Sequence, residues 1–257
     1  TLGCPEVSLD EVLALAHTHG IEEIEVRALG GTVDLPAYLA QNFGTPDALA
    51  AKLSGCGVRL VAFDTSFKLI GNDEATRAAL LAFMPWAEAL AVPRLRVFDG
   101  GAPGKSPDLS GALATLDWWR GERERHGWRA QLMVETHDAL TNTPAILEFA
   151  RHAPECGVLW DTHHTWKKGG EDPLMTWAAI KHSVVHVHVK DSVSKPSARH
   201  PFTYVLPGEG EFPMASIREV LAREFRGTVS LEWERQWHPY LPQLKDALRV
   251  AAERSWW

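Results

Sequence analysis

The sequence predicts one (β/α)8 TIM barrel that spans residues 1–257 as a single domain. Three observations lead to this fold class. Short apolar runs alternate regularly with amphipathic segments, no long polar linker interrupts the alternation, and 257 residues is a usual length for one such barrel. Apolar residues make up 45% of the chain and charged residues 23%, as in an ordinary globular protein.

Each apolar run is short and bounded by turn-forming residues, which predicts a strand. In chain order the eight predicted strands are residues 2–4, 23–27, 59–63, 94–98, 131–135, 158–161, 184–189 and 229–232. The first helix begins with a capping box of Ser8 and Glu11, and Gly20 suits its end. Further helices are predicted over residues 46–54, 74–90, 110–126, 143–152, 173–182, 214–224 and 240–253. Two loops rich in Gly and Pro, residues 99–107 and 192–213, follow strands and should cover the rim at their carboxyl ends.

The overall charge and the cysteine content narrow the function classes. The formal net charge of −7 disfavours nonspecific nucleic-acid binding, which needs Lys and Arg to neutralise phosphates. Three cysteines without a CxxC pair predict free thiols. No apolar run is long enough to cross a bilayer, and the start lacks the regions of a signal peptide, so the cytoplasm is the expected compartment.

The last four predicted strands each end on a potential metal ligand. In chain order these residues are Glu135, Asp161, His188 and Glu232. Parallel strands end at one rim, so the four side chains should surround one point. Two glutamates, an aspartate and a histidine form an oxygen-rich set that suits Mn²⁺ or Mg²⁺, with Zn²⁺ or Co²⁺ as alternatives. The sequence therefore predicts one divalent metal per chain.

Each of these positions has a plainer interpretation. Asp161 could cap the next helix, with His164 on the surface. We prefer a site, because four strand ends that carry ligand groups on one rim are hard to explain by packing. In strand 184–189, His188 lies nearest the carboxyl end and is the better ligand, and His186 is expected to be a hydrogen-bonded core residue or a support for the ligand.

Several neighbouring side chains are candidate substrate contacts. Lys190 could reach a substrate oxygen or pair with Asp191. His137 shares a face with Glu135 and could touch the substrate, although a position without a role is nearly as good an interpretation. Trp166, one of eleven tryptophans, could form an aromatic wall beside the metal.

Polar residues also end the earlier strands. Glu25 and Arg27 share a face, and a structural ion pair is the preferred interpretation, with Glu25 kept as a candidate substrate contact. Asp64 and Asp99 end the next two strands and could bind substrate hydroxyls or cap helices. Other chemistries lack support, because the sequence has no GxSxG, Walker A, HExxH or strand-linked GxGxxG motif.

These motifs resemble the xylose-isomerase-like TIM barrels, the superfamily of sugar phosphate isomerases and epimerases that also includes endonuclease IV. The likeness covers essentially the whole chain and is clearest at Glu135-Thr-His137, Asp161-Thr-His-His164, His188-Val-Lys-Asp191, Gly208-Glu-Gly210 and Leu231-Glu232. The resemblance implies that the four strand-end ligands hold the metal and that His164 contacts substrate. The ketose 3-epimerases carry an Arg and a Glu where this chain has Ser194 and Thr141, and these departures weaken the expectation of a ketohexose substrate.

The leading hypothesis is a metal-dependent isomerase or epimerase of a sugar or sugar-like keto compound. Glu135 or Glu232 would remove the proton next to the carbonyl, and His164 would steady the oxygen that gains charge in the enediolate. A lyase or dehydratase acting on a keto-inositol or a 3-keto-glycoside needs the same enolate and is the alternative.

An endonuclease IV-like phosphodiesterase is a weaker third hypothesis. That enzyme needs additional histidines, whereas the third and fourth strands here end in Asp64 and Asp99. The expected partner is a small carbohydrate, with no nucleic acid and no membrane. A homodimer or homotetramer is left open.

Overall fold

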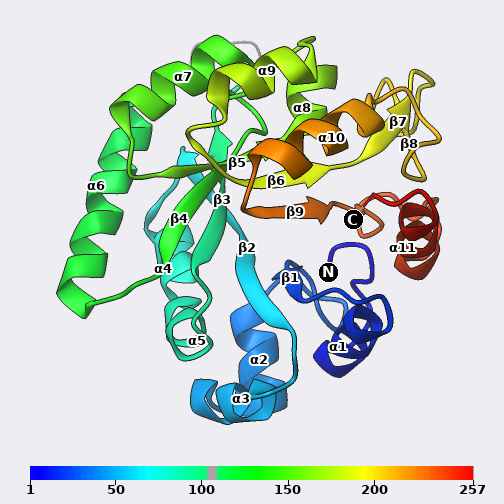
Figure 1. Ribbon diagram of the computed structural model, residues 1–257. Coiled ribbons are helices and arrows are strands. Elements are labelled where there is room, and N and C mark those ends of the chain that lie inside the picture. Colours follow the sequence, from blue (N-terminus) through cyan, green and yellow to red (C-terminus); the bar gives the residue numbers. More distant parts are fainter. Residues whose placement is uncertain (103–108, 257) are drawn as a thin grey trace.

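The computed structural model describes residues 1–102 and 109–256, and its centre is a ring of parallel strands surrounded by helices (Figure 1). Seven strands form one sheet in the order β1-β2-β3-β4-β5-β6-β9, and every neighbouring pair is parallel. The strands are β1 (Glu23–Val26), β2 (Arg59–Ile70), β3 (Arg94–Gly100), β4 (Gln131–Glu135), β5 (Gly157–Asp161), β6 (Val184–Val189) and β9 (Thr228–Leu231). The predicted class, a TIM barrel, is confirmed, as a nearly closed barrel.

The first predicted strand, residues 2–4, is wrong. The backbone N–H of Cys4 donates to the carbonyl of Thr1 at 3.0 Å, so this segment folds into a turn. A segment that bonds back on itself presents no continuous row of N–H and C=O groups to neighbouring strands. The described sheet therefore has seven strands rather than eight and stays open between β1 and β9, where Figure 1 places the N-terminal end.

Helices cover the outside of the barrel. They are α1 (Leu9–Thr18), α2 (Leu35–Phe43), α3 (Pro46–Leu53), α4 (Glu74–Leu81), α5 (Met84–Ala89), α6 (Leu109–His126), α7 (Thr143–His152), α8 (Thr162–Lys167), α9 (Pro173–Ile180), α10 (Met214–Glu224) and α11 (Leu244–Glu253). In the described part of the chain, none of these helices is long and apolar enough to cross a membrane.

Some predicted helix boundaries need correction. The helix predicted over residues 74–90 is two helices, because Pro85 has no N–H to continue the ladder from α4. The helix predicted over residues 240–253 begins only at Leu244, two residues after Pro242. Helix α2 was not predicted, although Asp34 caps it by accepting from the N–H of Ala37 at 3.3 Å.

The predicted loop over residues 192–213 contains an antiparallel hairpin of β7 (Asp191–Val193) and β8 (Thr203–Val205). The Asp191 carboxylate holds the returning chain by accepting backbone N–H groups from Gly208 and Gly210, both at 2.9 Å, and from Phe212 at 3.0 Å. A Cβ at Gly210 would lie 2.1 Å from the Asp191 Oδ1, so only glycine fits there. Of the other predicted loop, residues 99–107, the part from 103 onward lies outside the described residues.

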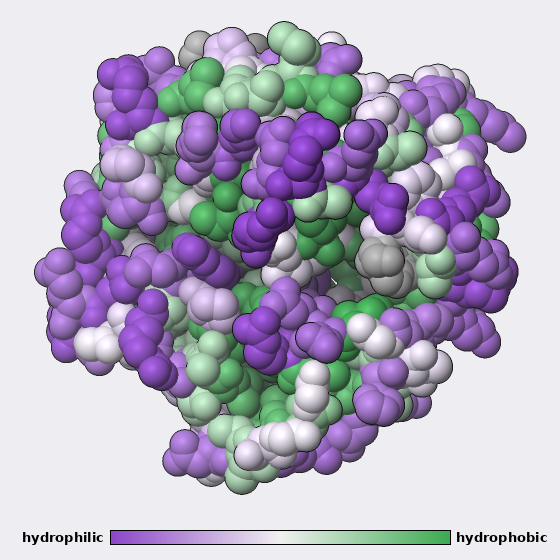
Figure 2. All heavy atoms as spheres, viewed as in Figure 1, coloured by the Kyte–Doolittle hydropathy of each residue, from purple (hydrophilic) through white to green (hydrophobic). Residues whose placement is uncertain are grey.

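Two layers of apolar side chains form the core. Successive side chains of a strand point to opposite sides, so one set packs against the helices and the other fills the barrel. Ala62, Met133 and Leu159 form a small buried cluster that is separate from the large core beneath the helices. Each large apolar side chain that is fully buried contributes about 1.5–3 kcal/mol. Hydrophilic side chains dominate the periphery of the face in Figure 2, and hydrophobic residues are visible toward its centre.

Candidate metal centre and its surroundings

The four strand-end residues meet at one point. Glu135, Asp161, His188 and Glu232 each offer one ligand atom, and these atoms all lie within 4.8 Å of one another. The register explains the convergence, because Asp161 on β5 lies directly beside His188 on β6, and Glu232 directly follows β9. The structure therefore brings together the four side chains that the sequence selected.

Asp161 performs two tasks with its two oxygens. Its Oδ1 accepts the backbone N–H groups of His163 and His164, both at 2.9 Å, and so caps α8. Its Oδ2 accepts no hydrogen bond from a described residue and lies 2.8 Å from the Lys190 Nζ. The helix cap and the site, which the sequence presented as alternatives, are both present.

Glu25 orients His188 from behind. The Nε2 of His188 lies 2.9 Å from the Glu25 Oε2, and its Nδ1 lies 3.4 Å from the Glu232 Oε1. A carboxylate behind a histidine ring selects which nitrogen carries the proton and leaves the other free for a ligand. Burial is the largest influence and lowers the pKa of His188, but Glu25 and Glu232 outweigh it, and the pKa lies well above its usual value.

The predicted ion pair between Glu25 and Arg27 is wrong. Glu25 instead lies between His188 and His186, whose Nε2 is 2.6 Å from the Glu25 Oε1. Arg27 donates from its Nη2 to the hydroxyl of Ser66 at 2.8 Å. Glu25 and Arg27, although close together in the sequence, therefore each interact with side chains on other strands. The location of Glu25, behind the histidines, favours an orienting role over the substrate contact expected from the sequence.

The residues fit a divalent cation. Three buried atoms that face the group make no hydrogen bond within the described chain: the Oε2 of Glu135, the Oδ2 of Asp161 and the Nδ1 of His188. Two of these atoms lie near a cationic side chain, since the Asp161 Oδ2 is 2.8 Å from the Lys190 Nζ and the Glu135 Oε2 is 3.2 Å from the Arg96 Nε, and buried polar atoms without a hydrogen bond are uncommon in proteins. Three carboxylates and one imidazole are ligands that such a cation accepts in place of water.

Lys190 forms ion pairs with two of the same carboxylates, those of Asp161 and Glu232. Its ammonium is 2.8 Å from the Asp161 Oδ2 and 2.6 Å from the Glu234 Oε1, and it also contacts the Glu232 Oε2. The side chain is only 2% exposed, and its Nζ lies 5.5 Å from the centre of the Tyr204 ring. Burial is the largest influence on the pKa of Lys190 and lowers it, but the carboxylates raise that pKa well above its usual value. The suggested pairing of Lys190 with Asp191 is wrong, because the Asp191 carboxylate binds the hairpin backbone.

His164 is buried beside the centre, and His137 lies at its edge. The Nδ1 of His164 is 3.0 Å from the carbonyl oxygen of Thr136, and the two imidazole rings meet edge to face at 4.8 Å. Burial first, and then Lys190, hold the pKa of His164 well below its usual value, so this ring is neutral. His137 is bonded to Asp138 at 2.9 Å, and 33% of its side chain is exposed.

Trp166 lies on α8, and its ring packs against other aromatic rings. Its ring lies against His163 and Phe212, each at 5.4 Å, and the Lys167 ammonium is 4.1 Å from the ring centre. The role of Trp166 as an aromatic wall beside the metal stays a prediction. Tyr204 on β8 lies nearer, above Lys190, and no signal in the sequence distinguished it from other loop residues.

Arg96 is a second residue that the sequence reasoning missed. It is 2% exposed, and its Nε lies 3.2 Å from the Glu135 Oε2 and 3.7 Å from the Asp64 Oδ1. Burial first, and then the nearby Glu25, raise the pKa of Asp64 to about 7. A signal was available, since an arginine at the middle of an otherwise apolar strand needs a buried partner.

Asp99 supports the loop that follows β4. Its carboxylate accepts the backbone N–H groups of Asp138 and Leu140, at 2.9 Å and 2.6 Å. Burial raises its pKa to about 6. Of the two roles that the sequence left open, these contacts match the structural one, although the carboxylate holds a loop rather than capping a helix.

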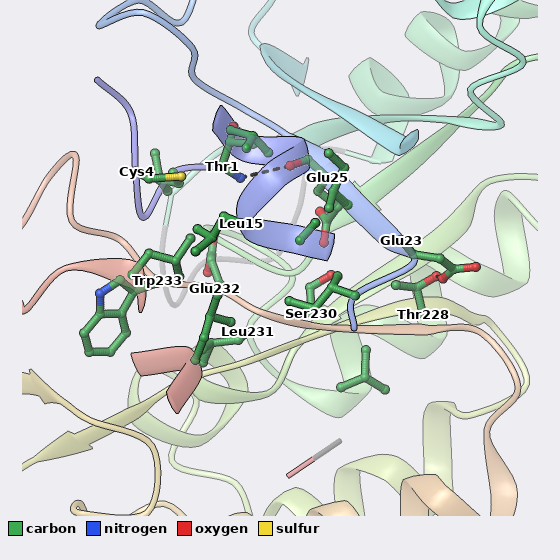
Figure 3. A pocket seen from close by; sticks show the side chains of 18 of the residues that line it. Thr1, Cys4, Leu15, Glu23, Glu25, Thr228, Ser230, Leu231, Glu232 and Trp233 are labelled. Atoms are coloured by element: carbon green, nitrogen blue, oxygen red, sulfur yellow. Dashed lines mark hydrogen bonds between the residues drawn. The ribbon is translucent and has the colours of Figure 1, made fainter. Parts of the chain in front are cut away.

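A cavity of about 440 Å³ opens between β1 and β9 and reaches the charged group from the side. Its inner wall includes Glu25, Asp64, His188 and Glu232. Figure 3 shows Glu25 and Glu232 on facing segments of this cavity, with the amino group of Thr1 hydrogen-bonded to the carbonyl of Glu25 at 2.9 Å. The open side of the sheet thus leaves the back of the centre uncovered by a strand.

The chain is thus a (β/α) barrel with potential metal-ligand groups at the carboxyl ends of four adjacent strands. The sequence profile described as "Xylose isomerase-like TIM barrel" matches residues 13–254. The chain belongs to this family. Comparison with curated protein sequences found no match.

Similar solved structures include proteins with different named activities. One is the probable 3-DHS dehydratase AsbF from Bacillus anthracis, with 18% identity over 98% of this chain and 97% of that chain and a TM-score of 0.75. Another is the IOLI protein with a bound zinc atom, with 18% identity over 99% and 94% and a TM-score of 0.73. A third is the 3-keto-D-glucoside 4-epimerase YcjR from E. coli, with 14% identity over 95% and 93% and a TM-score of 0.64. At such identities the likeness shows the shared fold.

Proposed function

We propose that the protein is a divalent-metal-dependent isomerase or epimerase that removes the proton next to a carbonyl group of a sugar or sugar-like keto compound. The observation that carries the proposal is the convergence of four ligand groups whose facing atoms include three without hydrogen-bond partners. The sequence has no GxSxG nucleophile motif, which agrees with proton transfer rather than covalent catalysis.

The proposed ligands are Glu135, Asp161, His188 and Glu232, and Glu25 holds the His188 ring in place. Three carboxylates favour Mn²⁺ or Mg²⁺, while Zn²⁺, which the similar IOLI structure holds, and Co²⁺ also accept this set. A bound divalent metal would supply Lewis-acid polarisation of the substrate carbonyl.

The proposed bases are the carboxylates of Glu135 and Glu232, which would transfer the proton at the substrate carbon next to the carbonyl. They come from β4 and from the end of β9, on different sides of the group, so one can take a proton and the other can return it to the opposite face or to the neighbouring carbon. Lys190 lies beside the same group and would donate a hydrogen bond to the oxygen that gains charge in the enediolate, and His164, whose Nε2 lies 3.5 Å from the Lys190 Nζ, would contact the substrate beside it. His137 lies next to His164 and is the proposed contact at the outer edge of the substrate.

A lyase or dehydratase is the second candidate, and His137 is the observation that favours it. Loss of a hydroxyl β to the carbonyl needs a proton donor at the leaving oxygen. His137 is part exposed and bonded to Asp138. Burial is the largest influence and lowers the pKa of His137, but the bond to Asp138 and the nearby Glu135 raise it above its usual value.

The test is turnover of keto sugars, keto-inositols and 3-keto-glycosides in D₂O by the Mn²⁺-loaded protein. Proton abstraction should place deuterium on the carbon next to the carbonyl, seen by NMR. The mass of the product separates the two candidates, because isomerisation conserves mass and dehydration loses one water. Product that carries no deuterium at that carbon would contradict both.

A further inference from the structure

Arg27 is a buried arginine that lacks a full set of partners. It follows β1 directly and is 6% exposed. Its Nη2 donates to Ser66, but its Nη1 is buried and makes no hydrogen bond in the described chain, and no carboxylate lies within ion-pair distance. A guanidinium group has five N–H donors in a fixed fork, and a buried charge without a counter-ion is costly. A buried arginine left in this state indicates a partner that the described part of the chain does not supply.

The surroundings of Arg27 place it at the candidate centre. The charges that act on it belong to Arg96, Asp64, Glu135 and Glu232. Burial first, and then the neighbouring Arg96, lower the pKa of Arg27 to about 10. Arg96 is already bound to Glu135 and lies near Asp64, whereas Arg27 repels Arg96 without a close anion of its own. An anion beside Arg27 would relieve this repulsion.

The hydroxyl that Arg27 contacts lies at the open mouth of the barrel. Ser66 and Lys68 are exposed on β2, whereas Thr65, Phe67 and Leu69 between and beside them are buried, so Ser66 and Lys68 share the face that solvent reaches. Lys68 therefore adds a second cation two residues beyond the Arg27 contact. A ligand on this face would meet the exposed Lys68 ammonium, and the buried Arg27 guanidinium lies behind the Ser66 hydroxyl that it contacts.

We infer that the substrate carries a carboxylate, which the Nη1 of Arg27 binds while the keto group faces the Glu135–Glu232 centre. This inference rests on the proposed function and narrows its substrate class to keto-sugar acids and related keto acids. A carboxylate matches the planar fork of a guanidinium better than a hydroxyl does. In a chain with a net charge of −7, local cations at the mouth are also needed to attract an anion.

The experiment compares binding of 5-keto-D-gluconate with binding of its neutral relative D-fructose and of fructose 6-phosphate, by calorimetry on the Mn²⁺-loaded protein. The variants are Arg27→Gln and Arg27→Lys, with Arg59→Gln as the matched control. Arg59 is an exposed arginine at the amino end of β2, so its loss changes the net charge equally at the opposite end of the strand. Circular dichroism and metal content verify that each variant is folded and loaded.

The wild-type protein should bind 5-keto-D-gluconate about tenfold or more tightly than D-fructose, as expected for a charge-assisted pair. Arg27→Gln should remove this preference, Arg27→Lys should keep part of it, and Arg59→Gln should keep all of it. Equal binding of the two sugars by the wild type, no binding of either, or an unchanged preference in Arg27→Gln would overturn the inference. Tighter binding of fructose 6-phosphate than of the keto acid would replace the carboxylate by a phosphate and overturn it too.

Proton exchange in D₂O on the same samples separates this inference from the proposed reaction. A carboxylate preference that depends on Arg27, without α-deuteration of any keto compound, would support the anion site and contradict the proposed reaction. Deuteration of D-fructose and 5-keto-D-gluconate at equal rates, unaffected by Arg27→Gln, would support the reaction and overturn the anion site.

Discussion

The two sides of the barrel mouth differ in charge. On the side of β4, β5, β6 and β9, carboxylates crowd together, and the Lys190 ammonium lies among them as an internal counter-charge. On the side of β1 to β3, the guanidinium groups of Arg27 and Arg96 are buried, and among the described residues only Arg96 has carboxylates within ion-pair distance. The first side thus has an excess of negative charge, and the second has a positive charge without a close counter-ion among the described residues. In the proposals above, the acidic side would hold the metal and the basic side would bind the carboxylate of the substrate.

The largest expected effect of a substitution is on the acidic side. Glu135→Gln and Glu232→Gln should each lower turnover on the order of 10² or more, because each removes a positioned base. Metal content must be measured with the rate, since both residues are proposed ligands. Glu155→Gln is the control, because Glu155 is half exposed and pairs with Arg120 at the surface. A variant that keeps the metal and the wild-type rate would remove that carboxylate from the chemistry.

Glu25 connects the acidic side to β1. Glu25→Gln should weaken Mn²⁺ binding roughly 10–100-fold, the usual effect of losing a partner that orients a ligand. The amide keeps the shape but accepts a hydrogen bond from the His188 Nε2 less strongly than the carboxylate does. Calorimetric titration with Mn²⁺ measures this, with the exposed Glu22→Gln as the control. Unchanged affinity would mean that packing alone orients the ring.

The Lys190 ammonium neutralises part of the negative charge on the acidic side, so it should compete with a bound metal ion. Lys190→Met should bind Mn²⁺ more tightly by on the order of tenfold, because a unit charge within about 4 Å opposes a second cation by a few kcal/mol at most near a protein surface. The metal-free variant should also melt at a lower temperature, since the carboxylates lose their counter-charge. Lys181→Met, which removes a surface lysine paired with Glu224, is the control. Weaker metal binding in Lys190→Met would show that the ammonium supports the metal site instead of competing for it.

The smallest expected effect is on the basic side, in the pH dependence of stability. The folded-state pKa of Asp64 is about 7, above the value of a free carboxyl, so the folded protein binds the extra proton between roughly pH 4 and 7. This group therefore stabilises the fold at low pH, and that stability is lost as the pH rises through 7.

Asp64→Asn should accordingly reduce the loss of folding stability between pH 4 and pH 8. We expect the wild type to lose about 1.4 kcal/mol or more relative to the variant between pH 4 and 8, the equivalent of one pKa unit. Urea unfolding of the metal-free proteins measures it, with the exposed Asp47→Asn as the control. Parallel curves for the wild type and Asp64→Asn would mean that Arg96 keeps Asp64 ionised throughout.

The convergence of the four ligand residues was predictable because it depends on local rules. Each lies at or directly after the end of a parallel strand, and the register of β5 and β6 sets Asp161 beside His188. The surroundings of these residues were not predictable in the same way. Glu25 and His188 are 163 residues apart in the sequence, and no periodicity along either strand indicates that they meet. The same holds for Arg96 with Glu135 and for Tyr204 above Lys190.

The sequence by itself determined the barrel class, most strand positions and the convergence of Glu135, Asp161, His188 and Glu232, because alternation along a strand and the common direction of parallel strands can be recognised in short segments. Only the tertiary structure decided that residues 2–4 form a turn and that Glu25 pairs with His186 and His188. It also decided that Arg27 has no carboxylate within ion-pair distance among the described residues. Those outcomes depend on which of several charged groups, on different strands, lies close enough to a buried partner to pair with it. That competition is settled by three-dimensional distance and desolvation, which residue order along one strand does not encode.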